Sequence, residues 1–267
     1  MMKSATKKIN TAFIDIDGTI FDSKSYYNPD LKGVIGGMIN EGFTIGLLTN
    51  RSLKSSLRVY QELNLNGLIV FEDGAAIYSP NKQKRINLVN NLTNLNAAQS
   101  IIKEAITSGK LLHEMKREDL VFKINDEKEY SISVHLRTAQ GTRCDELIAQ
   151  AVPAVESLLS NYTNLITYDT GRGNFLVRYV NSGKGTGIDY LVKRNMIKGD
   201  ETIIIGDGDN DVPAFRAVQL NGGMAGVVEN ATPRAKAFAD ILSENAYSDG
   251  VIEILNKIKM LNQIRRI

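Results

Sequence analysis

Two aspartates, Asp15 and Asp17, end a short apolar run and lead into a turn that contains Gly18. Side chains two residues apart in an extended segment point to the same side, so the two carboxylates are expected to lie together. Burying such a pair is costly unless a cation, a metal or several hydrogen-bond donors accompany it. The pair suits a site that binds a metal and transfers a charged group, because one carboxylate can attack while the other moves protons.

A second acidic cluster, Gly-Asp-Gly-Asp-Asn-Asp at residues 206–211, directly follows the Ile-rich run 202–205. In an open parallel sheet, both clusters would emerge at the carboxyl edge, where ligands bind. Carboxylates gathered there repel one another unless a divalent cation lies among them. Mg²⁺ prefers oxygen ligands, and phosphate oxygens commonly occupy part of its coordination shell. We therefore expect a Mg²⁺ site. The alternative is a pair of unrelated acidic turns or helix caps, which the placement of both clusters at strand ends disfavours.

Two further segments carry groups suited to binding a phosphate. Thr49, followed by Asn50, ends another apolar run, and its hydroxyl can donate to a phosphoryl oxygen while the next backbone N–H groups open a helix. Lys184 lies in a glycine-rich segment at a helix start, where the helix dipole favours an anion, and a bound phosphate would offset that mismatch. The alternatives are a plain helix cap at Thr49 or Ser52, and a flexible joint with a solvated lysine.

Weaker candidates for substrate binding lie in the middle of the chain. His135 occupies the polar face of an alternating segment, and Arg172 and Arg178 flank an apolar run where they could clamp an anionic substrate. For all three residues, a side chain that simply faces solvent is the commoner explanation. Cys144 has no obvious partner and is expected to be structural.

The bulk composition excludes several classes of protein. The chain has 267 residues and a formal net charge of +2, too small and too dispersed for nucleic-acid binding. A single cysteine rules out an internal disulfide framework and fits a reducing cytoplasm. No apolar run reaches the ~20 residues of a membrane span, and no signal peptide is visible. We expect a cytoplasmic protein, monomeric or homodimeric, whose partner is a small molecule.

The order of apolar and amphipathic segments predicts an α/β fold, a Rossmann-like parallel sheet with helices on both faces, interrupted by an insertion. Residues 1–80 and 183–267 carry the parallel α/β rhythm, and 81–182 form an inserted α+β domain. The core strands are expected at 12–16, 43–48, 68–71 and 202–205, with helices at 29–42, 52–63, 184–194, 212–217 and 233–238 and from 251, and a short apolar stretch lies near 224–228. The insertion is expected to hold helices at 94–108 and 142–159 and strands at 129–136, 165–168 and 175–179.

The strand at 129–136 alternates cleanly, which is typical of an antiparallel sheet with one exposed face. Tyr130, Ile132 and Val134 would lie on the apolar face, with Ser131 and Ser133 on the polar face.

The order of these motifs resembles that of the haloacid dehalogenase-like phosphatases. The matching segments are Asp-x-Asp-Gly-Thr at 15–19, Thr49 at a strand end, Lys184, and Gly-Asp-x-x-Asn-Asp at 206–211. The resemblance covers nearly the whole chain, and the position of the insertion is similar to that in subclass IIB, whose inserted cap domain closes over the core and selects the substrate. Branches of that subclass include Cof-like sugar phosphatases, phosphoglycolate phosphatases and mannosyl-3-phosphoglycerate phosphatases. Asp73 stands where these branches usually have Asn.

The resemblance implies a role for each matching position. Asp15 would be the nucleophile that forms an aspartyl-phosphate, and Asp17 would be the acid and then the base. Thr49, Asn50 and Lys184 would bind the phosphoryl group. The metal ligands would be Asp15, the backbone carbonyl of Asp17, and Asp207, with Asn210 and Asp211 behind them.

The expected activity is Mg²⁺-dependent hydrolysis of a small phosphorylated metabolite, a sugar phosphate or a phospho-acid such as phosphoglycolate or mannosyl-3-phosphoglycerate. Two alternatives use the same core. A phosphomutase would return the phosphoryl group of the aspartyl-phosphate to a reoriented product. A non-catalytic sensor of a phosphorylated ligand would have no need to keep both the nucleophile Asp15 and the acid Asp17.

Overall fold

The computed structural model describes residues 8–142, 145–170 and 173–264. It divides into two compact units, which are described separately. The first unit comprises Met1–Leu88 and Gly183–Ile267, and the second comprises Val89–Ser182. Within the described part of the chain, no helix combines the length and apolar character needed to cross a membrane.

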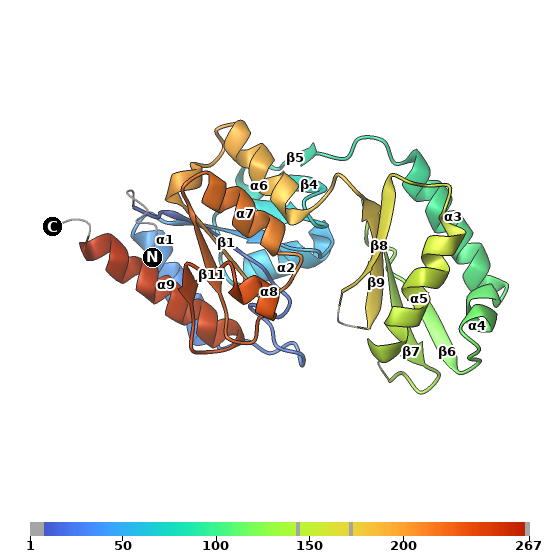
Figure 1. Cartoon of the computed structure of the whole chain (residues 1–267). Helices are drawn as coiled ribbons and strands as arrows, with labels where there is room; N and C mark the ends of the chain where they lie inside the picture. The colour runs from blue at the N-terminus through green and yellow to red at the C-terminus, as the bar shows by residue number, and fades with distance from the viewer. Residues whose placement is uncertain (1–7, 143–144, 171–172, 265–267) are drawn as a thin grey trace. The chain divides into compact units, whose positions relative to one another are not determined.

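The first unit is built on an eight-stranded sheet in the order β12-β11-β10-β1-β2-β3-β4-β5 (Figure 1). All neighbours from β12 to β3 are parallel, whereas β4 and β5 are added antiparallel at one edge. The strands are β1 (Thr11–Ile14), β2 (Thr44–Leu48), β3 (Ile69–Phe71), β4 (Ala76–Ser79), β5 (Lys84–Asn87), β10 (Thr202–Gly206), β11 (Met224–Val227) and β12 (Ile241–Leu242).

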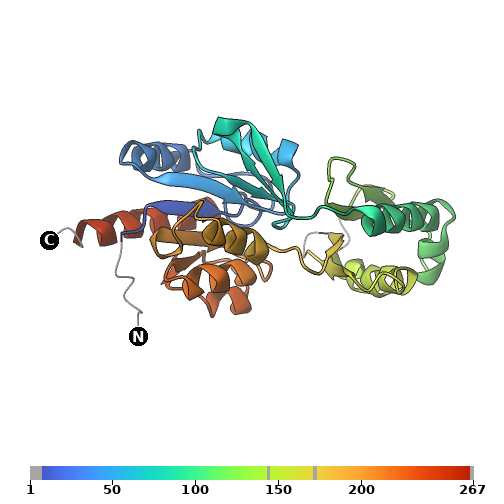
Figure 2. The ribbon, with the colours of Figure 1, turned by 90° about the horizontal axis from the view of Figure 1, so that it is seen from above.

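Helices cover both faces of this sheet, as the view from above shows for α1 on one side and for α6 and α7 on the other (Figure 2). Helix α1 packs against α9, and α6 packs against α7. The helices of the unit are α1 (Asp30–Asn40), α2 (Leu53–Glu62), α6 (Lys184–Lys193), α7 (Val212–Leu220), α8 (Pro233–Lys236) and α9 (Tyr247–Ile264), with short 3₁₀ turns at η1 (Pro80–Lys82) and η2 (Gly199–Glu201). The predicted α/β core with a parallel sheet is confirmed.

Local sequence explains where these elements begin and end. Strand β10 is buried along its whole length, which is why it contains three consecutive isoleucines and shows no alternation of polar and apolar residues. Helix α1 follows Pro29 and ends before Gly42, whose φ of 91° lies in the left-handed region. The side chain of Ser52 accepts a hydrogen bond from the Ser55 N–H and thus caps α2, so capping does not require Thr49.

The first boundary between the units falls at Leu88, eight residues later than the predicted end of the core at residue 80. The polar segment at 81–85 contributes to a hairpin, in which Gln83 has a φ of 49° and β5 pairs with β4. Charged residues are typical of an edge strand, because they discourage pairing with other chains, and this is why β5 resembles a linker in sequence.

The second unit is an antiparallel sheet in the order β6-β7-β9-β8, covered by helices on one face (Figure 1). Ile132, Val134 and Phe175 face a core that includes Leu95 of α3 and Ile148 of α5. Strand β6 and helix α4 were not predicted. The elements are α3 (Thr93–Thr107), α4 (Lys110–Glu114), β6 (Leu120–Ile124), β7 (Ser131–Thr138), α5 (Asp145–Leu158), β8 (Leu165–Asp169) and β9 (Asn174–Tyr179).

The prediction of one exposed face for the 129–136 segment is wrong at two positions. Ser131 and Ser133 are only 4% and 2% exposed. Their strand, β7, lies inside the sheet, and their partners on β9 are the larger Arg178 and Leu176. Small side chains flanked by longer ones lose their contact with solvent even on the polar face of a sheet.

Candidate active site

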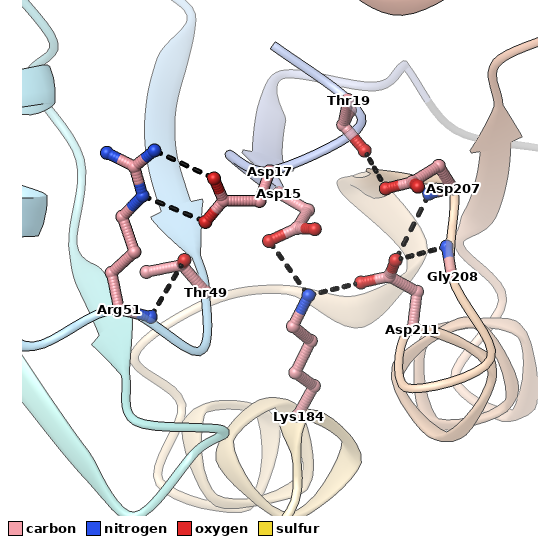
Figure 3. A network of polar contacts seen from close by, with 9 residues as sticks. All are labelled: Asp15, Asp17, Thr19, Thr49, Arg51, Lys184, Asp207, Gly208 and Asp211. Atoms are coloured by element: carbon pink, nitrogen blue, oxygen red, sulfur yellow. Dashed lines mark hydrogen bonds and ion pairs between the residues drawn. The ribbon is translucent and has the colours of Figure 1, made fainter. Parts of the chain in front are cut away.

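Three neighbouring strands of the first unit bring the predicted site residues to one edge. Because β1 lies between β10 and β2, the carboxyl ends of these parallel strands place Asp15, Thr49 and Asp207 side by side. Carboxylate oxygens of Asp15, Asp207 and Asp211 lie within 4.8 Å of one another. The predicted convergence of the two acidic clusters is therefore present in the structure (Figure 3).

Lys184 lies between two of these carboxylates. Its Nζ is 2.8 Å from Asp15 Oδ1 and 2.6 Å from Asp211 Oδ1, and the residue is only 1% exposed. Burial lowers the pKa of Lys184, but the charges of Asp15, Asp211 and Asp73 outweigh it and raise the pKa overall. Lys184 therefore stays charged, which suits a group that binds an anion.

The surroundings of Asp15 disfavour its ionised form. Burial raises the pKa of Asp15 well above 3.8; Lys184 opposes the rise, and Asp211 and Asp207 add to it. A divalent cation among these oxygens would reverse the balance, because it favours the ionised carboxylate. The donor set, made only of carboxylate oxygens, fits a hard cation such as Mg²⁺.

The loop after β10 is organised by hydrogen bonds to its acidic side chains. Oδ2 of Asp211 accepts from the backbone N–H groups of Asp207 and Gly208, at 3.1 and 2.9 Å. Oδ1 of Asp207 accepts from the Thr19 hydroxyl at 2.8 Å, which ties this loop to the turn after β1. Both acceptors are thus fixed before any ligand enters.

The remaining members of the second acidic cluster are Asn210 and Asp209, which differ in exposure. Asn210 is half-buried, and its side chain lies against Gly208. Asp209 is exposed and accepts from the Thr232 hydroxyl at 2.6 Å. Asp209 therefore serves the surface of the loop.

The carboxylate of Asp17 faces Arg51 and is not part of the acidic group around Asp15 (Figure 3). Arg51 donates from Nε and Nη2 to the two Asp17 oxygens, at 2.8 and 2.7 Å. Arg51 was not predicted as a site residue, although it is, like Lys184, a cation at the start of a helix. Its pairing with Asp17 depends on the adjacency of β1 and β2.

The two predicted phosphate-binding residues beside Arg51 differ in burial. Thr49 is fully buried, and its Oγ1 accepts from the Arg51 N–H at 3.1 Å. Asn50 is half-buried at the same strand end. The structure therefore places both residues at the edge that carries Asp15.

The glycine-rich segment at the start of α6 allows close packing at the residue next to Lys184. A Cβ on Gly185 would lie 2.7 Å from the carbonyl oxygen of Pro213 at the start of α7. Absence of a side chain is therefore required for α6 to approach α7. This geometry accounts for the glycine without the flexible joint considered from the sequence.

Asp73 occupies a position with a backbone constraint. Its φ of 54° lies in the left-handed region, which Asn and Asp both tolerate better than most residues do. Asp73 is buried, its N–H donates to the Thr49 carbonyl at 3.1 Å, and its charge raises the pKa of Lys184. The conformation explains why Asn and Asp can replace one another here.

The candidate specificity residues belong to the second unit. His135 is half-buried, and its pKa is lowered by burial and by the charges of Arg137, Lys128 and Lys123. Arg178 donates from Nη1 to the carbonyls of Tyr179 and Ser182, and its guanidinium lies 5.3 Å from the Tyr168 ring centroid. Arg172 and Cys144 lie outside the described residues. A role in specificity for His135, Arg172 or Arg178 stays a prediction.

The fold and the acidic edge agree with the comparison to known families. A family model described as haloacid dehalogenase-like hydrolase matches residues 12–255, and the chain belongs to this family. The resemblance predicted from the motifs is thereby confirmed, and the family and its phosphatase-named relatives support an enzyme of the phosphatase class.

Individual relatives and solved structures match along nearly the whole chain. The chain is 25% identical over 251 residues to a phosphoglycolate phosphatase of Methanobrevibacter smithii, covering 93% of this chain and 98% of the relative. Its fold is similar to the crystal structure of Thermoplasma acidophilum 0175, with a TM-score of 0.72, 19% identity, and coverage of 95% and 99%. It is also similar to the sucrose-phosphatase of Synechocystis in complex with sucrose and phosphate, with a TM-score of 0.60, 18% identity, and coverage of 95% and 99%.

Proposed function

We propose that the protein is a Mg²⁺-dependent phosphatase that hydrolyses a small phosphorylated metabolite through an aspartyl-phosphate at Asp15. One observation carries the proposal: Lys184 and the carboxylates of Asp207 and Asp211 surround the buried Asp15 at the carboxyl edge of a parallel sheet. Phosphoryl transfer needs positioned positive charge and an in-line nucleophile, and this cluster can supply both.

In the first half of the reaction, a carboxylate oxygen of Asp15 attacks phosphorus and the bond from phosphorus to the ester oxygen breaks. Asp17 gives its proton to that departing oxygen, so the alcohol leaves neutral. In the second half, Asp17 takes a proton from water, and the resulting hydroxide displaces Asp15 to release inorganic phosphate.

The remaining residues bind the phosphoryl group and the metal. Lys184 and the Thr49 hydroxyl, with Asn50, would contact phosphoryl oxygens; the 2.8 Å contact of Lys184 with Asp15 supports this role. Asp15, Asp207 and the backbone carbonyl of Asp17 would hold Mg²⁺, with Asn210 and Asp211 supporting them. Bound Mg²⁺ would neutralise charge that develops on the transferred group.

The substrate class follows from the names of the relatives and from the chemistry of the site. A phosphoglycolate phosphatase and a sucrose-phosphatase both match along the chain, so a phospho-acid and a sugar phosphate are the two classes to test. A phosphomutase would be recognised by an isomerised product that carries the transferred phosphoryl group, and a sensor by phosphate-ester binding without phosphate release.

The proposal is tested by phosphate release from phosphoglycolate, a panel of sugar phosphates and an aryl phosphate, with Mg²⁺ and with a chelator. We expect release only with Mg²⁺, and a loss of at least about 10³-fold in Asp15→Asn, because the nucleophile is removed. The matched control is Asp209→Asn, which neutralises an exposed aspartate of the neighbouring loop and should stay near wild type. Folded wild-type protein that releases no phosphate from any ester would contradict the proposal.

A further inference from the structure

Arg51 clamps the carboxylate of Asp17. Both of its oxygens accept from the guanidinium of Arg51, at 2.7 and 2.8 Å, in the bidentate geometry that fixes a carboxylate in plane as well as in distance. The Asp17 side chain is 37% exposed, whereas that of Asp15 is 7% exposed. The two contacts from Arg51 thus fix the direction and the plane of a carboxylate that is more exposed than that of Asp15.

Arg51 is itself held from several sides. Its guanidinium carbon lies 5.2 Å from the ring centroid of Phe21, and that ring meets Tyr27 edge to face at 5.4 Å. The backbone N–H of Arg51 donates to Thr49 Oγ1, and its carbonyl accepts from the N–H of Glu72 at 3.1 Å. Contacts at its backbone and at its guanidinium thus hold Arg51 in place, so that it can fix the position of the carboxylate that it binds.

Phe21, the aromatic support of the clamp, belongs to the turn that directly follows the nucleophile Asp15. Phe21 donates from its N–H to the Ile16 carbonyl and accepts from the Gly18 N–H, both at 2.9 Å, and so closes the turn that contains Asp17. Arg51 therefore connects the end of β2 to this turn through a charged pair and a ring contact. The connection lies entirely within the first unit.

We propose that Arg51 is a positioning residue for proton transfer by Asp17, an inference that rests on the proposed phosphatase function. Proton transfer needs the carboxyl group within hydrogen-bond reach of the leaving oxygen, and a freely rotating aspartate spends little time there. One of the two contacts can keep Asp17 in place while the other oxygen turns to the leaving group. A lysine cannot reproduce a planar fork, so the role is specific to arginine.

The test compares esters that do and do not need a proton on the leaving oxygen. In Arg51→Gln, kcat/KM for an alkyl phosphate should fall by roughly 10- to 100-fold, because leaving-group protonation is worth about 10²–10⁴-fold and would be partly lost. For 2,4-dinitrophenyl phosphate, whose phenolate departs unprotonated, the fall should be less than about threefold. kcat/KM is the measure of choice, because it reports phosphoryl transfer to Asp15 and excludes the later hydrolysis.

Five further variants test the role of Arg51 more closely. Arg51→Lys keeps the charge and one contact, and should show the same dependence on leaving group to a smaller degree. Added guanidinium ion should restore part of the alkyl-phosphate activity of Arg51→Ala, and Asp17→Asn combined with Arg51→Gln should be no slower than Asp17→Asn alone. Arg58→Gln, at an exposed position of α2, is the matched control and should match wild type with both esters.

A loss of equal size with both esters would overturn the inference, because it would show that Arg51 binds the phosphoryl group or only supports the fold. Unchanged kinetics, or a faster alkyl-phosphate reaction, would overturn it as well. Thermal unfolding of each variant identifies a variant that does not fold, and Arg51→Lys then decides the question. Failure of the proposed function itself is distinct, because wild type would then release phosphate from no ester.

Discussion

Lys184 makes the acidic edge of the sheet compatible with a folded protein. A buried ion pair has to offset the desolvation of both partners, and an unpaired buried carboxylate is more costly still. Here one ammonium group contacts both Asp15 and Asp211, while the third carboxylate, on Asp207, receives the Thr19 hydroxyl. The cluster therefore holds more negative charge than its own cation balances, and a divalent metal would complete it.

At the residue scale, this imbalance predicts that Mg²⁺ stabilises the protein more as pH rises. Burial raises the pKa of Asp15 above 3.8, so protonation of Asp15 favours the native state. In metal-free protein, the stabilisation that comes from protonated Asp15 is fully present below pH 3.8, the ordinary pKa of the carboxyl group. It is lost as pH rises through the raised pKa of the folded protein. Mg²⁺ competes with this proton, so the increase in Tm on adding Mg²⁺ should grow as pH rises above 3.8 and through the raised pKa of Asp15.

Thermal unfolding with Mg²⁺ and with a chelator, at a series of pH values, measures this difference directly. In Asp15→Asn the group has no proton to exchange, so the Mg²⁺ increment should be smaller and flatter across the same range. An increment in wild type that is constant with pH, or that falls as pH rises, would show that Asp15 does not contribute to metal binding.

Residue chemistry was the most predictable level, with one omission. The acidic clusters and Thr49 stand at the ends of apolar runs, so their meeting followed from the topology of a parallel sheet, whereas Lys184 was singled out as a cation at a helix start. The bond from Arg51 to Asp17 did not follow, because it depends on the direction of two side chains from adjacent strands. The burial of Ser131 and Ser133 depends likewise on neighbours that a single strand does not reveal.

At the element scale, long periodic segments were predicted and short ones were missed. Strand β10 and helix α2 have strong patterns and well-defined ends. Strand β5 and the five-residue helix α4 are too short or too charged to show a periodicity of their own. Their structure comes from the sheet edge and the core that they join.

Glycine at the start of α6 gives a prediction at this scale. Gly185→Ala should destabilise the protein by about 1–3 kcal/mol, because the new methyl group would press on the backbone of Pro213. Phosphate release should fall as well, since Lys184 is the adjacent residue. Gly37→Ala, in α1 where a Cβ meets nothing within 4 Å, should instead stabilise by about 0.5–1 kcal/mol.

Urea unfolding of the two variants and a phosphate-release assay give both quantities. The pair separates steric packing from helix propensity, because each substitution adds the same methyl group to a helix. An unchanged free energy of unfolding in Gly185→Ala would mean that α6 can shift away from α7 without loss, and that the close approach is not required.

At the scale of the whole molecule, the two units are joined by chain segments that leave the first unit from neighbouring points. The N–H of Leu88, the last residue before the second unit, donates to the Ala75 carbonyl at 2.9 Å. The carbonyl of Gly183, where the chain re-enters, lies against Gly74, at 2.1 Å from the position a Cβ would take there. The adjacent residues Gly74 and Ala75 thus contact the two points at which the chain leaves and re-enters the first unit. A short linker could therefore close the chain of the first unit without the second.

This arrangement predicts that the first unit folds alone when Val89–Ser182 is replaced by a short Gly/Ser linker. All eight strands of its sheet and the cluster of Asp15, Lys184, Asp207 and Asp211 remain within it. The shortened protein should unfold cooperatively in urea and should keep a rise in Tm on adding Mg²⁺ that Asp15→Asn reduces. Val89–Ser182 expressed separately should also fold, because it has a hydrophobic core of its own. A first unit that unfolds without cooperativity, or that gains nothing from Mg²⁺, would show that the metal site depends on the second unit.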